Sequence, residues 1–360
     1  QLECLMMIDW LTINIPYTHS DQINNGFVTG TTKDGEVEWS TAKRLPLQGS
    51  FESSINVKTD RNSYCPDTGT FSRIHVDGNP VKLFQGHNVF GTDNLPALCL
   101  ATAKLIYQTL GLKPSDIDLK KLSNLDIPIF RVDINYSFSL SNQLQVMSFI
   151  RSMEHQARLR HRGQGIFKGY TLYFGKNSRR WSLKIYSKHE EITTNKKGHL
   201  LHRNLINRDQ LISWSENKLR IEVTLRSLQL KDDKLDTASA WVQNTPKDIF
   251  NKYYEGLEMS SQQDLSTDAL YSLPAKLKPV YKLWQSGGDL REIYSKSTFY
   301  RHRKDLLEYG IDIAVTQRPE SSKSAQIIPL VVTLKAVEAE SVPEWAIGTD
   351  SYFQPEALLG

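Results

Sequence analysis

The chain has 360 residues, of which 39% are hydrophobic and 23% are charged, a composition that excludes a collagen, a coiled coil and a wholly disordered protein. Its length allows two or three domains. No apolar run reaches the ~18 residues of a membrane-spanning helix, and the first ten residues do not resemble a signal peptide, so we expect a cytosolic protein that binds no membrane. The three widely separated cysteines indicate neither a disulfide framework nor a zinc site.

The charge is distributed unevenly along the chain. The net charge is +4, but residues 151–231 contain 18 Lys and Arg and six Asp and Glu, so this segment carries +12 and the remainder −8. Aromatic residues are interleaved with these basic ones. This mixture is typical of a nucleic-acid groove, because cations replace phosphate counterions and rings stack on unpaired bases. A solvated charged surface is the alternative interpretation.

The first third is predicted to be rich in strands. The run MIDWLTINIPY, from Met7, predicts a first strand, and we leave residues 1–6 out of the fold prediction as an extension. Short alternating runs and turn residues continue to about residue 92. Asp93 can cap a helix over residues 95–110, which Gly111 would end. Residues 113–126 are predicted to be a polar connection.

Alternating apolar and polar residues predict further strands over 127–138, 169–175, 181–188 and 218–226. A helix over residues 144–162, capped by Ser141, separates the first two. We therefore expect an α+β fold with a central antiparallel sheet backed by helices. The polar sides of these strands would carry Arg131, Asp133, Asn135, Tyr173, Lys184, Tyr186, Lys188, Arg220 and Glu222.

This polar face is a candidate site for cleaving a phosphodiester. Asp133 and Glu222 offer the oxygen ligands that Mg²⁺ or Mn²⁺ prefers, and such a cation can polarise a phosphate. Tyr186 is a candidate nucleophile, since Lys184 and Lys188 would favour its phenolate form. The alternative is a set of ion-paired residues on a solvated sheet face.

The last third predicts helices over residues 277–284 and 289–294 and a third helix that starts after Ser297 and ends near Gly310. This order is typical of a helix-turn-helix, whose last helix could enter a major groove. An ordinary helical hairpin is the alternative. Residues 317–325 are predicted to be a flexible loop and residues 327–334 a closing strand. The basic residues of the third helix are Arg301, Arg303 and Lys304.

Several motifs resemble the replication initiator encoded by gene II of filamentous phages. They are KLFQGHNVFG (82–91), IFRVDINYSF, KIYSKHEE (184–191) and LRIEVTLR, together with MIDWL near the start and SVPEWAIGTDSYFQPE near the end. The resemblance covers nearly the whole chain from Met7, and QGHN is its most specific fragment. The stretch from TLYFGKNS to LKIYSKHEE is also similar to initiators of a group of rolling-circle plasmids.

The resemblance implies a metal-dependent single-strand endonuclease and strand transferase in the cytoplasm of a bacterial host. Members nick the plus strand of the double-stranded replicative form at the phage origin, stay attached to the 5′ end and rejoin the displaced single strand. It implies Tyr186 as nucleophile with Lys188 as electrostatic partner, and Asp133 and Glu222 as ligands of Mg²⁺ or Mn²⁺. Tyr173 is the alternative nucleophile. Implied partners are origin DNA and the host helicase and polymerase, with possible self-association at the origin.

The sequence departs from better-known rolling-circle nucleases, because it has no His-hydrophobic-His triplet. We therefore expect a related nuclease core with a carboxylate-rich metal site. His87 and Asn135 are additional candidates for the metal or a phosphate. Candidate DNA contacts are Arg131, Arg179, Arg180, Lys184 and Arg220, in addition to the basic residues of the C-terminal helix.

We expect three parts: an N-terminal β-rich part over 7–115 that carries QGHN, a nicking core over 116–257, and a helical DNA-binding region over 258–360. Two other functions remain open. One is a plasmid or mobile-element initiator or relaxase, which shares the chemistry and acts on a different origin. The other is a helix-turn-helix regulator that binds DNA without cutting it.

Overall fold

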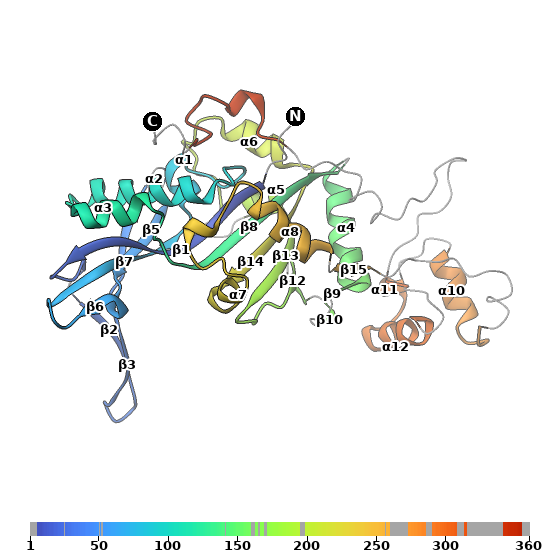
Figure 1. The fold of residues 1–360 in the computed structure, drawn as a ribbon. Helices are drawn as coiled ribbons and strands as arrows, with labels where there is room; N and C mark the ends of the chain where they lie inside the picture. The colour runs from blue at the N-terminus through green and yellow to red at the C-terminus, as the bar shows by residue number, and fades with distance from the viewer. Residues whose placement is uncertain are drawn as a thin grey trace.

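The computed structural model describes residues 6–24, 26–49, 51, 53–140, 142–159, 163–164, 166–168, 171–194, 199–255, 257–259, 273–285, 290–307, 313–314 and 341–354. Figure 1 shows strands and helices combined in one mixed structure, as expected for the α+β class. Among the described residues, no helix is both long and apolar enough to span a membrane.

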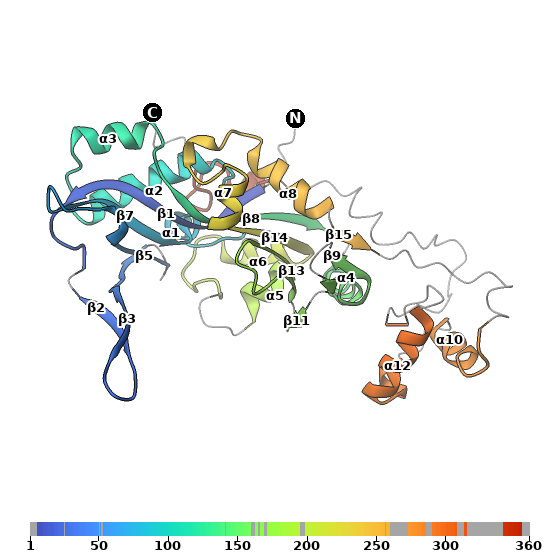
Figure 2. The same cartoon turned by 60° about the horizontal axis from the view of Figure 1, so that its bottom comes forward.

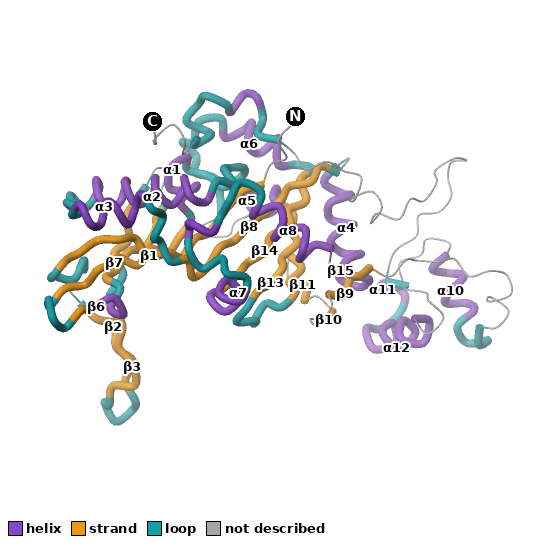
Figure 3. The backbone as a smooth tube through the Cα atoms, in the orientation of Figure 1, coloured by secondary structure: helices purple, strands orange, loops and turns teal. Residues whose placement is uncertain are grey.

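One antiparallel sheet of ten strands dominates the fold (Figure 3). Its order is β11-β12-β13-β14-β8-β1-β7-β5-β4, with β6 paired to β7. The sheet contains strands from both the predicted N-terminal part (7–115) and the predicted core (116–257). These two predicted parts therefore share one sheet. Its strands are β1 (Met6–His19), β4 (Leu45–Gln48), β5 (Ser54–Thr59), β6 (Tyr64–Cys65), β7 (Thr70–Gly78), β8 (Ile129–Ser139), β11 (Ile166–Lys168), β12 (Thr171–Phe174), β13 (Trp181–Ser187) and β14 (Lys218–Arg226).

Two smaller sheets accompany it. A hairpin of β2 (Phe27–Thr31) and β3 (Val37–Ala42) extends away from the main sheet in Figures 1 and 2. The other consists of β9 (Ala157–Leu159), β10 (Gly163–Gln164) and β15 (Leu257–Met259).

Helices cover the apolar face of the main sheet. Side chains of α2, α4, α7 and α8 share one core with the apolar side chains of the strands, among them Val132, Ile221 and Ile185. The helices up to residue 255 are α1 (Pro80–Gln85), α2 (Leu95–Thr109), α3 (Asp116–Ser123), α4 (Gln143–Gln156), α5 (Lys188–Thr193), α6 (Arg208–Ser215), α7 (Ser227–Asp232) and α8 (Thr245–Glu255).

Three helix predictions were wrong in detail. The cap of α2 is Asn94, whose side chain accepts from the Ala97 N–H, rather than Asp93. Residues 113–126 are not a plain connection, because Ser115 and Asp118 form a reciprocal capping box that starts α3. Helix α4 ends at Gln156, where the chain turns into β9, instead of continuing to residue 162. The predicted cap Ser141 lies outside the described residues.

The polar face of the sheet is also covered, which alternation did not predict. A second apolar cluster joins the loop after α1 to α5, α6 and the C-terminal segment 341–354, and includes Phe90, Ile192, Leu211 and Ala346. Segment 341–354 was expected to belong to the DNA-binding region. It packs instead against the loop after α1, α5 and α6.

The helices α10 (Lys278–Gln285), α11 (Leu290–Ile293) and α12 (Lys296–Leu307) have a cluster of their own that contains Trp284, Phe299 and Leu306. The cap of α12 was predicted at Ser297. The helix begins earlier, because the Ser295 hydroxyl accepts from the Thr298 N–H and so caps the first turn. The loop and closing strand predicted between residues 317 and 334 lie outside the described residues.

Candidate active site

Three neighbouring strands bring the predicted residues onto one side of the sheet. In the register of β14 and β8, Glu222 lies opposite Asn135 and Thr224 opposite Asp133. In the register of β13 and β14, Lys184 lies opposite Glu222. Residues opposite each other in antiparallel strands share a face, so Asp133, Glu222 and Lys184 all lie on the polar face, with Glu222 beside Lys184.

A β-bulge adds a carboxylate that the sequence analysis missed. Ile8 pairs with Ile134 and Leu11 pairs with Val132, so Asp9 and its neighbour lie opposite the single residue Asp133. Asp9 is therefore turned to the polar face, where it is 9% exposed. The available signal was an acidic residue inside the otherwise apolar run MIDWL.

Each carboxylate has partners within the protein. Arg131 donates two hydrogen bonds to Asp133, from Nε at 2.9 Å and from Nη2 at 2.5 Å. Lys184 Nζ and the Tyr186 hydroxyl both donate to Glu222 Oε2, each at 3.2 Å.

Asp9 is held by two amides. It accepts from the side-chain amide of Asn79 and, at 3.1 and 3.2 Å, from the side-chain amide of Asn88. Asn88 belongs to the QGHN motif, so this motif contacts the carboxylates through Asp9.

The carboxylates are close enough to repel one another. The pKa of Asp133 is raised to about 6, first by burial and then by the charges of Glu222 and Asp9, against the opposing effect of Arg131. Burial also raises the pKa of Asp9, with Glu222 as the next cause. Perturbed pKa values cluster at functional sites, which makes this face the candidate active site.

Tyr186 is more deeply buried than expected. It is 2% exposed, its hydroxyl donates to Glu222, and Lys184 Nζ lies 4.2 Å from the centre of its ring. Burial, followed by the charges of Glu191 and Glu222, raises its pKa well above the ordinary value. The expectation that neighbouring lysines favour the phenolate was therefore wrong, because burial and two carboxylates outweigh them.

Tyr173 lies beside Tyr186 on the same face. It is opposite Lys184 in the register of β12 and β13, where Thr171 is opposite Tyr186. Tyr173 is half-buried, and both tyrosines line a cavity of about 80 Å³ together with Lys184 and Glu191.

Lys188 does not contact Tyr186 as its sequence position suggested. It is the first residue of α5 and is completely buried, where its Nζ donates to Asn88 Oδ1 at 2.9 Å and to Glu191 Oε2 at 2.6 Å. Burial lowers the pKa of Lys188 to about 8 against the opposing charge of Glu191. Burial raises the pKa of Glu191, but Lys188 and Lys184 outweigh it, so this pKa falls to about 2.

Two predicted site residues are structural. Arg220 is completely buried, and its guanidinium donates to the backbone carbonyls of Asn88 and Val89, so it is not available to DNA. His87 is also completely buried, with Nε2 2.9 Å from the Ser351 carbonyl oxygen and Nδ1 accepting from the Val89 N–H. Because protein groups occupy both ring nitrogens, His87 does not fit a metal ligand.

The remaining predicted DNA contacts differ in exposure. Arg179 and Arg180 are exposed in the turn between β12 and β13, where Arg180 pairs with Asp232. The side chains of Arg131 and Lys184 are 38% and 23% exposed at the carboxylates. In the helical unit formed by α10, α11 and α12, Arg301 and Lys304 of α12 are exposed, whereas Arg303 is only 8% exposed.

The donor chemistry of the face fits a hard divalent cation. Within the described ranges, no three Asp, Glu, His or Cys side chains are already gathered around one point, because Asp9, Asp133 and Glu222 are each turned to a protein partner. Asn135 is 1% exposed, and among the described residues its Nδ2 has no hydrogen-bond partner, so this buried N–H is free to donate to a phosphate oxygen. The three carboxylates are an oxygen-rich set suited to Mg²⁺ or Mn²⁺.

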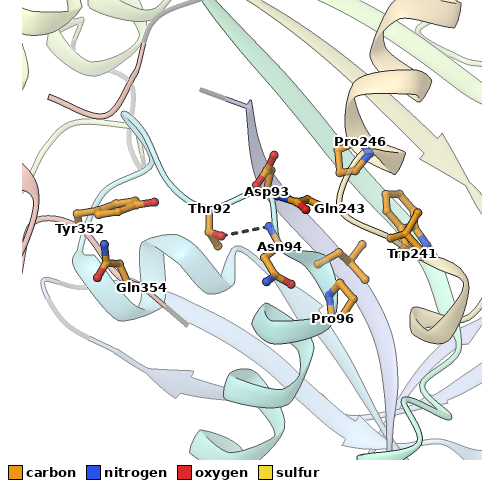
Figure 4. A pocket seen from close by; sticks show the side chains of 11 residues that line it. Thr92, Asp93, Asn94, Pro96, Trp241, Gln243, Pro246, Tyr352 and Gln354 are labelled. Carbon is orange, nitrogen blue, oxygen red and sulfur yellow. Dashed lines mark hydrogen bonds between the residues drawn. The ribbon is translucent and has the colours of Figure 1, made fainter. Parts of the chain in front are cut away.

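A larger cavity of about 450 Å³ lies elsewhere, between the start of α2, residues 241–246 and the C-terminal segment (Figure 4). Its charged lining residue is Asp93, and Trp241, Gln243, Tyr352 and Gln354 also border it. The lining contains neither candidate nucleophile and no basic side chain, so this cavity is separate from the carboxylate face.

The chain matches two family models of the phage replication-associated protein of gene 2. The model of the N-terminal part matches residues 7–244, and the model of the C-terminal part matches residues 265–349. The chain is 38% identical over 337 residues to the replication-associated protein of gene 2 from Enterobacteria phage I2-2, covering 94% of this chain and 95% of that protein. It is 22% identical over 332 residues to the protein of the same name from Salmonella phage IKe, with 78% and 76% covered.

Among solved structures, a rolling-circle replication initiator protein from Geobacillus stearothermophilus is similar with a TM-score of 0.34 and 12% identity, over 74% of this chain and 90% of that one. The family models and the phage I2-2 relative confirm the resemblance found in the motifs. The chain therefore belongs to the family of the phage gene 2 replication-associated proteins.

Proposed function

We propose that this member of the gene 2 family initiates rolling-circle replication of a filamentous phage by nicking and rejoining origin DNA at the carboxylate face. The observation that carries the proposal is the hydrogen bond from the Tyr186 hydroxyl to Glu222. A carboxylate within hydrogen-bond reach of a hydroxyl is the arrangement of a nucleophile with its general base. Family membership supports a role in phage DNA replication.

The tyrosine oxygen attacks the phosphorus while the proton passes from Tyr186 to Glu222. The P–O bond to the 3′ oxygen breaks, this oxygen takes up a proton, and the 5′ phosphate stays on the tyrosine. Tyr186 needs a base because its raised pKa keeps it protonated at neutral pH. The tyrosyl ester retains the phosphodiester energy, so the reverse attack by a 3′-OH can circularise the displaced strand.

Tyr173 is the second candidate nucleophile. Its half-buried ring lines the same small cavity, whereas Tyr186 is only 2% exposed. Lys176 Nζ lies 5.1 Å from the centre of the Tyr173 ring and supplies a nearby positive charge.

A divalent cation would be held by Asp9, Asp133 and Glu222, and the unpaired N–H of Asn135 would donate to a phosphate oxygen. Once bound, the cation would supply Lewis-acid polarisation of the scissile phosphate. Arg131 and Lys184 would balance the charge of the carboxylates in the absence of DNA and contact phosphate in its presence. Full nicking activity in EDTA would contradict this part of the proposal.

The test uses the purified protein, Mg²⁺ and a supercoiled plasmid that carries the plus-strand origin of the phage encoding this chain. We expect relaxed circles with a protease-sensitive adduct at the 5′ end of the nick. Tyr186→Phe should remove the adduct and leave origin binding unchanged. Tyr64→Phe is the matched control, because Tyr64 is a 49% exposed tyrosine at the other end of the sheet.

Tyr173→Phe decides between the two tyrosines. Loss of the adduct in Tyr173→Phe with normal nicking by Tyr186→Phe would transfer the nucleophile to Tyr173. Origin binding by the unaltered protein with no nick under any metal condition would favour the non-enzymatic DNA-binding regulator. Nicking confined to a plasmid or mobile-element origin would favour the other alternative.

A further inference from the structure

We propose that the C-terminal segment 341–354 is a positioning element of the nicking site. It holds the loop over residues 85–90 against the carboxylate face, from the side opposite the sheet. This inference rests on the nicking activity proposed above, and it assigns a role to the motif SVPEWAIGTDSYFQPE that DNA binding by the helical unit does not explain.

The segment binds the loop through ring contacts and backbone hydrogen bonds. Phe353 stacks on Phe84 with ring centres 4.0 Å apart, and its N–H donates to Gln85 Oε1 at 2.9 Å. Phe90 meets Trp345 and Tyr352 edge to face, with ring centres 5.8 and 6.3 Å apart. Phe90 is buried and Trp345 and Tyr352 are half-buried, and all three belong to one apolar cluster.

His87 joins the segment to the loop with a defined proton position. Its Nε2 lies 2.9 Å from the Ser351 carbonyl oxygen, which can only accept, so Nε2 carries the hydrogen. Nδ1 is then the acceptor for the Val89 N–H at 3.2 Å. Burial lowers the pKa of His87 to about 3, so the ring stays neutral and keeps this arrangement at working pH.

Asn88 is the residue through which the loop contacts the site. The Asn88 amide donates to both oxygens of Asp9, and its Oδ1 accepts from Lys188. From the sheet side, Arg220 donates to the backbone carbonyl oxygens of Asn88 and Val89. Asn88 is thus fixed between the catalytic sheet and the C-terminal segment.

Further pairs connect Asn88 to the candidate nucleophile. Lys188 pairs with Glu191 at 2.6 Å, and Lys184 lies 4.0 Å from Glu191 and 3.2 Å from Glu222, which accepts from Tyr186. Release of the segment therefore loosens Asn88, Asp9 and Lys188 together. A site misplaced by about 1 Å can lose on the order of 10²-fold in rate without a matching loss in binding.

The experiment compares full-length variants of the segment and the loop in single-turnover nicking. Phe353→Ala removes the stacked ring, whereas Phe353→Tyr retains it. Ile347→Ala is the matched control within the segment, because Ile347 is apolar and 53% exposed. We expect Phe353→Ala to lower the nicking rate constant by about tenfold to 10²-fold, with the Kd for origin DNA unchanged and the two controls near the unaltered rate.

His87 provides a second, independent pair of variants. His87→Gln places an N–H near the position of Nε2 and should restore most of the rate that His87→Leu loses. A metal-ligand role for His87 would instead make both variants equally inactive, which overturns the positioning role. Circular dichroism and thermal unfolding of each variant check that the main sheet is folded.

Two other results would overturn the inference. One is an unchanged rate in Phe353→Ala and His87→Leu. The other is an equal loss of rate and DNA affinity with a collapse of folding in every non-conservative variant, which indicates a structural role only. Absence of nicking by the unaltered protein would instead refute the proposed function, so the two failures can be told apart.

Discussion

The pKa values of the carboxylates are shifted in opposite directions in the two halves of the polar face of the main sheet. In the half made by β1, β5 and β7, Asp77 accepts from Trp10 Nε1 at 3.0 Å, from Thr12 Oγ1 at 2.7 Å and from Arg44 at 3.0 Å. These bonds outweigh burial and lower its pKa. In the half made by β8, β13 and β14 with the start of β1, the pKa values of Asp9 and Asp133 are raised.

This difference in pKa shifts shows which half of the face carries charges that destabilise the folded chain. Both halves lie on the same face, since Thr12 pairs with Asp77 on one side and with Arg131 on the other. The first half surrounds Asp77 with three donors, whereas the other crowds three carboxylates together and leaves Asn135 Nδ2 without a partner among the described residues. Such local conflict is expected where function, not stability, selects the residues.

The largest effect is expected on the nicking rate, which a substitution in the crowded half should lower far more than one in the half around Asp77. Glu222→Gln should lower the nicking rate by about 10²- to 10⁴-fold, because the neutral amide cannot accept the Tyr186 proton. Asp77→Asn is the control on the same face and should stay within a few-fold of the unaltered rate. Single-turnover nicking at saturating protein measures both. A similar loss in the two variants would mean that the site is not confined to the crowded half.

The second prediction concerns stability without metal. Asp9→Asn should raise the free energy of unfolding, on the order of 1 kcal/mol, because it removes a buried charge that Glu222 repels. Asp77→Asn should lower it by about 1 kcal/mol, because a satisfied acceptor loses its charge. Urea unfolding at pH 7 in EDTA measures both. The comparison fails if the two shifts have the same sign.

The pH dependence of stability should also differ between the halves. The pKa of Asp77 is below 3.8 in the folded chain, so its contribution is present above pH 3.8 and is lost as the pH falls through the folded-state pKa. The pKa of Lys188 is lowered from 10.5 to about 8, so the unfolded chain holds more protons between these values. The contribution of Lys188 to stability therefore increases from pH 8 to pH 10.5.

Urea unfolding of the unaltered protein against Asp77→Asn and against Lys188→Met isolates the two groups. The advantage of the unaltered protein over Asp77→Asn should shrink in acid. Its advantage over Lys188→Met should grow between pH 8 and pH 10.5. A flat difference in the alkaline window would show that Lys188 keeps its ordinary pKa.

The smallest effect is expected outside the sheet, where charge is exposed and screened. Replacing Arg301 and Lys304 of α12 by Ala should weaken binding to duplex origin DNA a few-fold and reduce the salt dependence of the affinity by about two counterions. Fluorescence anisotropy between about 50 and 200 mM salt measures both. Unchanged affinity and slope would favour the plain helical hairpin over groove recognition.

Much of the fold was predictable from local pattern. Alternation located β8, β13 and β14 to within two residues and gave the correct face to Asp133, Lys184 and Glu222. This succeeded because successive side chains of a strand point to opposite faces, whatever surrounds them. The family resemblance relied on the same short motifs.

The predictions failed where distant segments meet. Arg220 and His87 were assigned to DNA and to a metal, but each is buried by a contact with residues far away in sequence, Asn88 and Ser351. Asp9 was missed because a bulge, not alternation, turns it to the polar face. Neither the burial of a polar face nor the pairing of its charges can be read from a local pattern.

The sequence by itself determined the strands, the basic segment and the family, because these depend on residue type and spacing. Only the tertiary structure decided which charges are neighbours and which are withdrawn from water. The cover formed by residues 85–90, α5 and segment 341–354 converts an alternating strand face into a buried site. Burial raises the pKa of Tyr186 there, and the proposed mechanism therefore gives this tyrosine Glu222 as a base rather than lysines as activators.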